Sequence, residues 1–425
     1  MRAAPSDDDS RSARAIYAVR KLLPNIKASA ITMKATSMGG SNRQTYRVDV
    51  AQESYFVRIL PEGYEANAWN GRFSKSCVAN TVAMGEAGVT APVLASDESA
   101  IVQQFIPSAR VETTPWRNTL EDHTEARRIG AMVAQIHSVP YPDPGAPLAP
   151  HCLYSGQEKG DSTSLQRGCS RSNSRKRSIH ALSSSREMIA RPKMSQNEWK
   201  TTEIGASKVG QRLTLSPPGF YCWYDMPEWY AQDPPFLQCW EYLEAREPPP
   251  GVGGEVVFTH GDLHNKNVLV SLADGGLVPV DFELSGRGHR AFDLAFFFWH
   301  WSPNFVAKPY PCFPARQAVA RAYLAASGLP AYRDDVCDLL YAVEYCIPRV
   351  ALSRANHVGP DMRQDYLAHL PVACKILRRA AVGDEDVRDA VIEQGILPLA
   401  AQGCIPGEDG PPLWDLGCTT PCTCS

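Results

Sequence analysis

The sequence predicts an α+β fold with strands in its N-terminal and central parts and a mainly helical C-terminal part. Runs of apolar and β-branched residues at 54–60 and 100–107 are typical of strands. Three more short runs lie between residues 256 and 282, and an Asp-Gly turn between two of them indicates a hairpin. Beyond residue 315 the apolar residues recur with the 3.6-residue period of helices.

The composition is ordinary for a globular protein. The 425 residues are enough for one two-lobed enzyme or two domains, and 44% of them are apolar while 21% are charged. A net charge of −3 gives no reason to expect nucleic acid or a membrane surface as a partner. The N-terminus has no apolar secretory segment, and no run of 18 apolar residues occurs. We therefore expect a cytoplasmic protein without stable membrane insertion.

A short polar turn follows the strand predicted at 256–259. It reads His260-Gly261-Asp262 and presents one carboxylate at the end of the strand. A carboxylate in such a place can accept a proton from an attacking hydroxyl. His264 follows, and it either faces phosphate groups or serves only as a hydrogen-bonding residue of the loop.

The hairpin is expected to bring further oxygen ligands to the same end of a small sheet. Folding it between the runs 267–271 and 277–282 places Asn267 opposite Phe282, or opposite Asp281 if the loop has an odd number of residues. Four side chains then converge: Asp262, Asn267, Asp281 and Glu283. Such oxygens suit Mg²⁺, which takes one or two carboxylates together with phosphate oxygens and water. A structural Asx turn is the competing interpretation of an Asp-Asn pair on loops.

The pattern HGDLHxxN, followed by a hairpin and DFE, resembles the kinase-like phosphotransferases of small molecules, the aminoglycoside phosphotransferase and choline kinase group. This resemblance implies a two-lobed protein-kinase-like fold, with a small N-lobe that carries an antiparallel sheet and a larger, mainly helical C-lobe. It also implies ATP as co-substrate and Mg²⁺ as cofactor. Asp262 would be the catalytic base, and Asn267, Asp281 and Glu283 would surround the metal.

The residues after the hairpin resemble the choline/ethanolamine kinase branch, through FEL, RAFDL and FWHW. Members of that branch end this helix in a Glu-Trp pair. Trp301 matches the tryptophan, whereas His300 stands where the glutamate is expected. In that branch the acid and nearby aromatic rings hold the quaternary ammonium, so the resemblance implies that Trp301 and His300 lie at the acceptor. Trp223, Trp229 or Tyr230, from an aromatic cluster, would supply a further ring there, and packing of this cluster as a helix on the C-lobe is the alternative. Glu344 is one candidate for the missing acid.

A glycine pair precedes the strand predicted at 54–60. Gly39 and Gly40 are followed by Ser41 and Asn42, and glycine lets backbone N–H groups approach phosphate oxygens closely. A plain hairpin turn is the alternative explanation of this loop.

An arginine lies within the strand itself. Arg58 matches the arginine that choline-kinase-like proteins carry on this strand, so the resemblance implies a phosphate-binding role. A surface arginine is the alternative. The helix predicted at 73–86 has Cys77 where relatives carry the glutamate that pairs with this residue, so its partner is either missing or supplied from elsewhere, for example by Glu62 or Glu65.

The run 100–107 resembles the EQFIP segment that links the two lobes in choline kinases. The resemblance implies that its backbone, from Gln104 to Ile106, meets the edge of the adenine ring.

The sequence predicts an N-lobe at 15–107, which binds nucleotide, and a catalytic C-lobe at 108–400. A Ser/Arg-rich segment at 151–218 interrupts the C-lobe and lacks the apolar residues needed to offset the entropy of ordering. We expect this insert to be disordered, together with residues 1–14 and the Cys-rich tail 401–425. The basic insert does not predict RNA binding, because almost no aromatic residues are interleaved with its charges.

Helices are predicted at 15–23, 73–86, 124–139, 236–247, 315–327, 334–345, 366–381 and 385–394. Pro348 is expected to interrupt the helix that begins at 334, since proline lacks the N–H donor that a helix interior needs.

Together these features predict a kinase that transfers the γ-phosphoryl group of Mg-ATP to choline or ethanolamine, a step of phospholipid head-group synthesis. Two alternatives remain: a related kinase for an amino sugar or amino acid, which His300 favours, and a pseudokinase that only binds ligands, which Cys77 favours. A homodimer is compatible with each of these functions.

Overall fold

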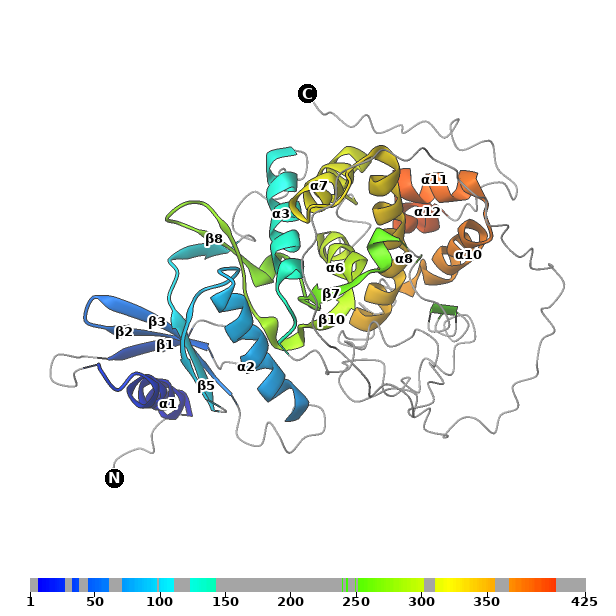
Figure 1. Ribbon diagram of the computed structural model, residues 1–425. Helices are drawn as coiled ribbons and strands as arrows, with labels where there is room; N and C mark the ends of the chain where they lie inside the picture. Colours follow the sequence, from blue (N-terminus) through cyan, green and yellow to red (C-terminus); the bar gives the residue numbers. More distant parts are fainter. Residues whose placement is uncertain are drawn as a thin grey trace, which may run out of the picture. The chain divides into compact units, whose positions relative to one another are not determined.

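An antiparallel sheet of five strands forms the N-terminal region of the computed structural model (Figure 1). The strands run in the order β1-β2-β3-β5-β4, and every neighbouring pair is antiparallel. Their bounds are Lys34–Ser37 (β1), Thr45–Val50 (β2), Glu53–Ile59 (β3), Val93–Ser96 (β4) and Ala100–Gln104 (β5). With helices forming most of the C-terminal region, the predicted α+β fold is confirmed.

The structure describes residues 7–26, 33–37, 45–60, 71–97, 99–110, 123–142, 239, 242–243, 249, 251–301, 310–355 and 367–402. The insert predicted at 151–218 lies outside these residues, as does the tail beyond residue 402.

Helix α1 (Asp7–Leu22) packs on one face of the sheet (Figure 1). Its buried residues Ala15, Ala18 and Val19 share a core with alternate residues of β2, β3 and β5. The helix begins eight residues before the predicted start at 15, so that prediction was wrong. A run of acidic residues is a favourable beginning for a helix, because the N-terminus of a helix carries partial positive charge.

Two small sheets form where one was predicted. Strand β7 (Val256–Thr259) pairs with β10 (Gly286–His289), whereas the hairpin of β8 (Val268–Ser271) and β9 (Leu277–Pro279) pairs with β6 (Ser108–Arg110). Such pairings between distant segments cannot be inferred from local sequence patterns.

The register of the hairpin also differs from the prediction. Ser271 N–H donates to the Gly276 carbonyl and Gly275 N–H donates to the Ser271 carbonyl, so the strands are joined by residues 272–275. As a result the Asn267 carbonyl accepts the N–H of Val280 at 2.9 Å. Asn267 therefore lies opposite Val280 rather than Asp281 or Phe282.

Helix α2 (Gly71–Glu86) lies between β3 and β4 in the chain. The later helices are α3 (His123–Ser138), α6 (Arg290–Trp301), α7 (Phe313–Ala326), α8 (Arg333–Ala355), α10 (Leu370–Ala381), α11 (Glu385–Gln394) and α12 (Ile396–Ala401). Three short 3₁₀ helices, η6 (Val252–Gly254), η7 (Asn265–Asn267) and η8 (Phe282–Leu284), lie around the predicted site.

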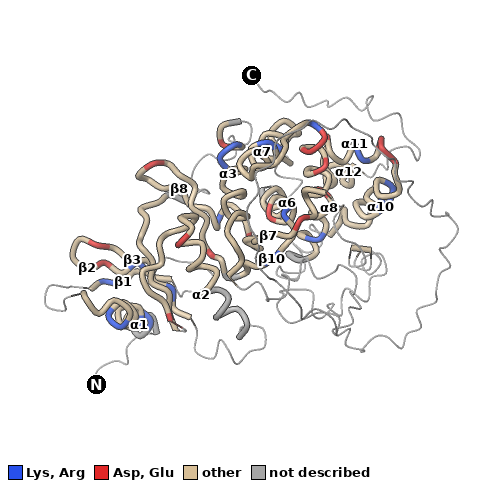
Figure 2. Tube along the Cα trace, viewed as in Figure 1, with Lys and Arg blue, Asp and Glu red and all other residues tan. Residues whose placement is uncertain are grey.

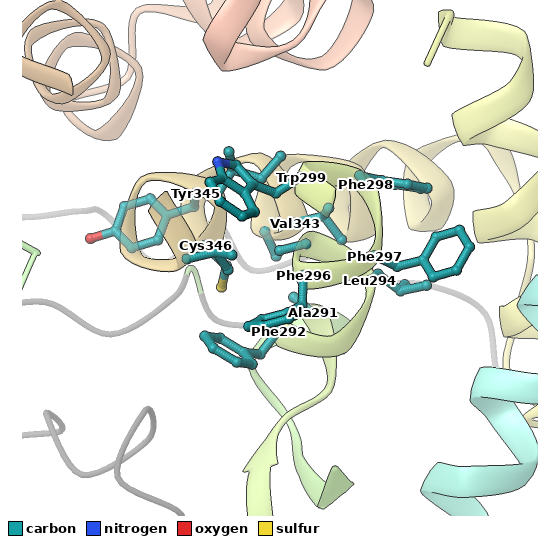
Figure 3. Packing of buried hydrophobic residues seen from close by; sticks show 14 of the residues in the cluster. Ala291, Phe292, Leu294, Phe296, Phe297, Phe298, Trp299, Val343, Tyr345 and Cys346 are labelled. Atoms are coloured by element: carbon teal, nitrogen blue, oxygen red, sulfur yellow. The ribbon is translucent and has the colours of Figure 1, made fainter. Parts of the chain in front are cut away.

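Helix α6 forms the centre of the larger core. Its side chains are buried nearly all round, including those of Phe296, Phe297, Phe298 and Trp299. Figure 3 shows these rings beside residues of α8 such as Val343. A helix that is apolar on every side is buried on every side, so the predicted site residues that flank α6 rest on a rigid support.

Helix α8 continues through Pro348, contrary to the prediction that the helix is interrupted there. A proline in a helix interior costs about 3 kcal/mol. The neighbouring side chains Ile347, Val350 and Leu352 are fully buried. Burial of side chains of this size contributes about 1.5–3 kcal/mol each, which offsets the cost.

Charged side chains of both signs are interspersed along the helices and strands (Figure 2). Within the part of the chain that the structure describes, no helix combines the length and the apolarity needed to cross a membrane.

A buried ion pair joins α7, α8 and α12. The side chains of Arg316 and Glu344 are fully buried, with Arg316 Nη1 2.6 Å from Glu344 Oε1. The same carboxylate accepts the Tyr310 hydroxyl and the Ile396 N–H, each at 2.9 Å. With these partners Glu344 stabilises the packing of the helices.

Removing one member of this pair should destabilise the protein strongly. We expect Glu344→Ala to lower the free energy of unfolding by about 3–5 kcal/mol, because it leaves the Arg316 charge buried and unpaired. The matched control is Asp338→Ala, which breaks the ion pair of Arg388 with a carboxylate that is 57% exposed. That change should cost less than about 1 kcal/mol. Urea unfolding of both variants measures the difference, and equal losses would contradict the assigned role.

Candidate active site

The turn His260-Gly261-Asp262 follows β7 and contacts the η8 segment. Gly261 has a φ of 78°, and a Cβ atom built on it would lie 2.2 Å from the Leu284 carbonyl oxygen. Only glycine fits both the left-handed backbone and this close approach. The turn thereby holds Asp262 in one position relative to η8.

A buried carboxylate on α6 fixes the backbone of this turn. Asp293 accepts the His260 N–H at 2.7 Å and the Gly261 N–H at 3.0 Å. His137 Nε2 of α3 lies 3.0 Å from the same carboxylate, and its Nδ1 lies 2.8 Å from the Tyr323 hydroxyl of α7. Three helices therefore support the turn at 260–262.

Burial by itself would raise the pKa of Asp293, but the hydrogen bond and charge of His137 and the backbone amide of His260 hold it below its usual range. The group is therefore a permanent carboxylate. This role of Asp293 was not predicted from the sequence. The aspartate was visible only as part of the RAFDL segment, and its partners lie more than 30 residues away in the chain.

The structure brings Asp262, His264 and Asn267 together, whereas the prediction grouped Asp262 and Asn267 with Asp281 and Glu283. Asn267 Nδ2 donates to the Asp262 carbonyl at 3.0 Å and to Asp262 Oδ2 at 3.2 Å. His264 Nε2 lies 3.6 Å from Asp262 Oδ2, and the two side chains are 13% and 14% exposed. Asp262 is thus oriented by the backbone and by two neighbours, while part of it remains open to a substrate.

The tautomer of neutral His264 follows from a backbone contact. The Lys266 N–H donates to His264 Nδ1 at 3.1 Å, so the ring proton lies on Nε2. That nitrogen is the one that faces Asp262. His264 therefore presents a donor to the catalytic carboxylate, and this supports the hydrogen-bonding interpretation of the residue.

The other histidine of the turn is structural. His260 Nε2 lies 2.9 Å from the Val280 carbonyl, and its Nδ1 accepts the Asp262 N–H at 3.3 Å. Burial lowers the pKa of His260. This neutral ring ties the catalytic turn to the end of the hairpin, which immediately precedes Asp281.

Asp281 pairs with Arg58. Arg58 Nη1 of β3 lies 2.5 Å from Asp281 Oδ1. Burial acts to raise the pKa of Asp281, but the charge and hydrogen bond of Arg58 outweigh it, so the pKa lies below its usual value. The partner that the sequence analysis sought for Arg58 on the following helix is therefore found at the hairpin. Glu62 and Glu65 lie outside the described residues.

Two further features concern Asp281 and the η8 segment that follows it. Asp281 has a φ of 72°, in the left-handed region that aspartate tolerates better than most residues. Helix α2 contacts η8, and Asn80 Nδ2 donates to the Ser285 carbonyl at 2.9 Å. Residues of the N-terminal region thus contact Asp281 and Ser285, the residues that flank η8.

The segment predicted to meet adenine has two of its amides committed to the sheet. Gln104 N–H donates to the Pro92 carbonyl at 3.0 Å, and Phe105 N–H donates to the Ser54 carbonyl at 3.1 Å. The backbone N–H of Ile106 is then the candidate donor to an adenine ring in this segment, and Ile106 is half-buried.

His300 lies next to His264. The centroids of their rings are 4.8 Å apart, and Phe296 lies 4.8 Å from His300. Burial, followed by the charges of His264 and Lys266, holds the pKa of His300 well below its ordinary value. The predicted acceptor residue is thus a neutral imidazole one side chain away from Asp262.

Several predicted residues fall outside the description. The backbone of Gly39, Gly40, Ser41, Asn42, Trp223 and Trp229 and the side chains of Cys77, Glu283 and Trp301 are not among the described parts.

The donor set suits Mg²⁺ only together with phosphate oxygens. No group of three or more His, Cys, Asp or Glu side chains gathers into a metal cage within the described ranges. Asp281 and Asn267 supply one carboxylate and one amide, and Mg²⁺ commonly takes one or two carboxylates with waters and substrate phosphates. The residues present fit a metal that arrives with a nucleotide.

The lowered pKa values of His260 and His300 predict a pH dependence of stability. Each folded pKa lies below the unfolded value of about 6.5. The unfolded chain therefore binds more protons below that pH, and stability is lost as the pH falls from about 6.5. In the His300→Phe variant the free energy of unfolding should fall less steeply as the pH is lowered, by up to about 1.4 kcal/mol per pH unit. Urea unfolding between neutral and mildly acidic pH tests this, and identical slopes in both proteins would contradict it.

Comparisons with known proteins find similar chains among choline and ethanolamine kinases. Choline/ethanolamine kinase of Rattus norvegicus is 35% identical over 66 residues, which are 15% of this chain and 17% of the relative. Choline kinase of Schizosaccharomyces pombe is 31% identical over 109 residues, which are 21% of this chain and 24% of the relative. Each match spans less than a quarter of the relative. The crystal structure of choline kinase from Cryptosporidium parvum has 14% identity and a TM-score of 0.49, covering 91% of this chain and 98% of that one.

Residues 32–334 match the phosphotransferase enzyme family. This range covers well over half of the chain and includes Arg58, the catalytic turn, the hairpin and helix α6. The chain therefore belongs to the phosphotransferase enzyme family.

Proposed function

We propose that the protein is an ATP-dependent kinase that transfers the γ-phosphoryl group to the hydroxyl of a small amino alcohol of the choline and ethanolamine class. Its product would be a phosphorylated head group for phospholipid synthesis. The observation that carries this proposal is Asp262, held between Asn267 and His264 on a turn anchored by Asp293.

Asp262 is the proposed base. Its carboxylate is oriented by Asn267 and faces the Nε2–H of His264, which leaves it a defined direction from which to accept the hydroxyl proton. Phosphoryl transfer requires mainly positioning and charge stabilisation, so a rigidly held carboxylate is the principal requirement.

The Arg58–Asp281 pair supports the nucleotide half of the proposal. Arg58 carries the positive charge that a phosphate needs, and Asp281 carries the negative charge that Mg²⁺ needs. Bound Mg²⁺ would neutralise the charge of the phosphate oxygens. Asp281 and Asn267, assisted by Glu283, would hold it, and the Gly39–Asn42 loop would cover the phosphates. When nucleotide and metal bind, a phosphate would replace Asp281 as the partner of Arg58, and Mg²⁺ would replace Arg58 as the partner of Asp281.

A second acceptor class is favoured by one observation. His300 is neutral and stands at the position where a glutamate was expected. A neutral residue there weakens the case for a quaternary ammonium and favours hydroxylated substrates such as an amino sugar or amino acid.

The first test is Asp262→Asn. We expect turnover to fall about 10²–10⁴-fold, the usual contribution of a positioned general base, while ATP binding changes little. Phosphorylated product formed from ethanolamine and choline would be measured directly. The control is Asp274→Asn on the exposed loop of the hairpin, where activity should be retained. Unchanged turnover in Asp262→Asn would remove this residue from the mechanism.

The second test concerns the metal. Asp281→Ala should abolish the dependence of ATP affinity on Mg²⁺, because it removes the carboxylate best placed to hold the ion beside the phosphates. ATP binding without Mg²⁺ should be retained, since Arg58 loses its competing partner. Calorimetric titration with and without Mg²⁺ measures both quantities. A mutant whose ATP affinity still rises with Mg²⁺ as in the wild type would place the metal elsewhere.

A further inference from the structure

The Nε2 atom of His300 is buried and lacks a hydrogen-bond partner among the described residues. A buried polar atom left unpaired costs free energy, and in native proteins such atoms are infrequent and call for an explanation. Close to a catalytic residue, a ligand that supplies the missing partner is one such explanation.

The position of His300 connects it to the reacting groups. Its ring lies 4.8 Å from that of His264, whose Nε2 is 3.6 Å from Asp262 Oδ2. Phe296, one helical turn earlier on α6, packs against both histidine rings. A small alcohol whose hydroxyl meets Asp262 would therefore have its other end within reach of this cluster.

The chemistry of a neutral imidazole differs from that of the glutamate expected there. Burial and the nearby charges of His264 and Lys266 keep His300 unprotonated, as its lowered pKa indicates. A neutral ring offers no net negative charge to a cation. With its proton on Nδ1, it offers one lone pair at Nε2, which can accept a hydrogen bond from an N–H group.

We propose that His300 Nε2 selects the acceptor, accepting a hydrogen bond from the ammonium group of a primary, secondary or tertiary amino alcohol and disfavouring a quaternary one. This inference rests on the proposed function. Choline has no N–H and leaves Nε2 unpaired, whereas ethanolamine satisfies it. Because both substrates carry the same single positive charge, Coulomb interactions with Lys266 and His264 affect them alike.

The test uses ethanolamine and its N-methyl, N,N-dimethyl and N,N,N-trimethyl derivatives, the last being choline. The first three compounds retain at least one N–H, and only the final methylation removes the last donor. For the wild type we expect kcat/KM to fall about tenfold or more at that final step, which is the effect of leaving a buried polar group unpaired. Steric crowding alone would instead lower kcat/KM gradually over all the steps.

The matched variant is His300→Phe, which keeps the ring packing against Phe296 and His264 but removes Nε2. In this variant the drop at the final methylation should disappear. His300→Glu should raise kcat/KM for choline, because it supplies the negative charge that a quaternary ammonium requires. His369→Phe, at the N-terminal cap of α10, is the control and should leave the wild-type profile unchanged.

A final-step drop of the same size in wild type and His300→Phe would overturn this role for His300. If His300→Phe does not fold, as judged by thermal unfolding, His300→Leu provides the same comparison. If none of the compounds is phosphorylated, the proposed function fails. Equilibrium binding of the same series to wild type and variant then tests the hydrogen bond separately, and binding without a step at the last methylation would exclude it.

Discussion

The buried carboxylate of Asp293 is the constraint on which the site depends. It lies inside the protein, where an unpaired charge would be very costly, and it is satisfied by two successive backbone amides and by His137. Those amides belong to His260 and Gly261. If the backbone of the turn moved, the buried Asp293 carboxylate would lose these two hydrogen bonds. Gly261 completes the constraint, since its backbone conformation and its contact with Leu284 exclude a side chain. These contacts fix the position of Asp262.

Under the proposed function the charged pair at the hairpin has the opposite character, because its members would exchange partners when nucleotide and metal bind. Arg58 is 15% exposed and Asp281 is 36% exposed, so both remain accessible to solutes. Opposite charges at a distance of 2.5 Å are stable together, yet each is also suited to one half of a metal-phosphate unit. The rigid Asp262 turn and this exchangeable pair are joined by His260, which bonds to the Val280 carbonyl immediately before Asp281. Under the proposed function, the site combines a fixed base with an ion pair that responds to the nucleotide.

Local patterns in the sequence predicted much of this arrangement. The bounds of β7 and α11 agree with prediction, because an apolar β-branched run and a capped amphipathic segment are encoded within a few residues. Asp262, His264 and Asn267 converge because they are close in the chain and a 3₁₀ turn folds them together.

Other features depend on contacts between distant segments and were not predictable in this way. The hairpin register was misjudged because the hydrogen bonds of its loop decide it, and Arg58 finds Asp281 across 223 positions of sequence. Helix α8 passes through Pro348 because tertiary burial outweighs local preference. Asp293 carried no signal of its role, since a buried acid is recognisable only when its donors are known.

The most direct test of this account is the activity of Asp293→Asn. The substitution keeps the shape of the side chain but places an amide nitrogen against a backbone N–H of the turn or against His137. Small displacements of catalytic groups can cost about 10²-fold in rate. We therefore predict that kcat falls by about that factor at temperatures where urea unfolding shows the variant to be folded, with ATP affinity retained. A folded Asp293→Asn variant with wild-type kcat would contradict the claim that this carboxylate positions Asp262.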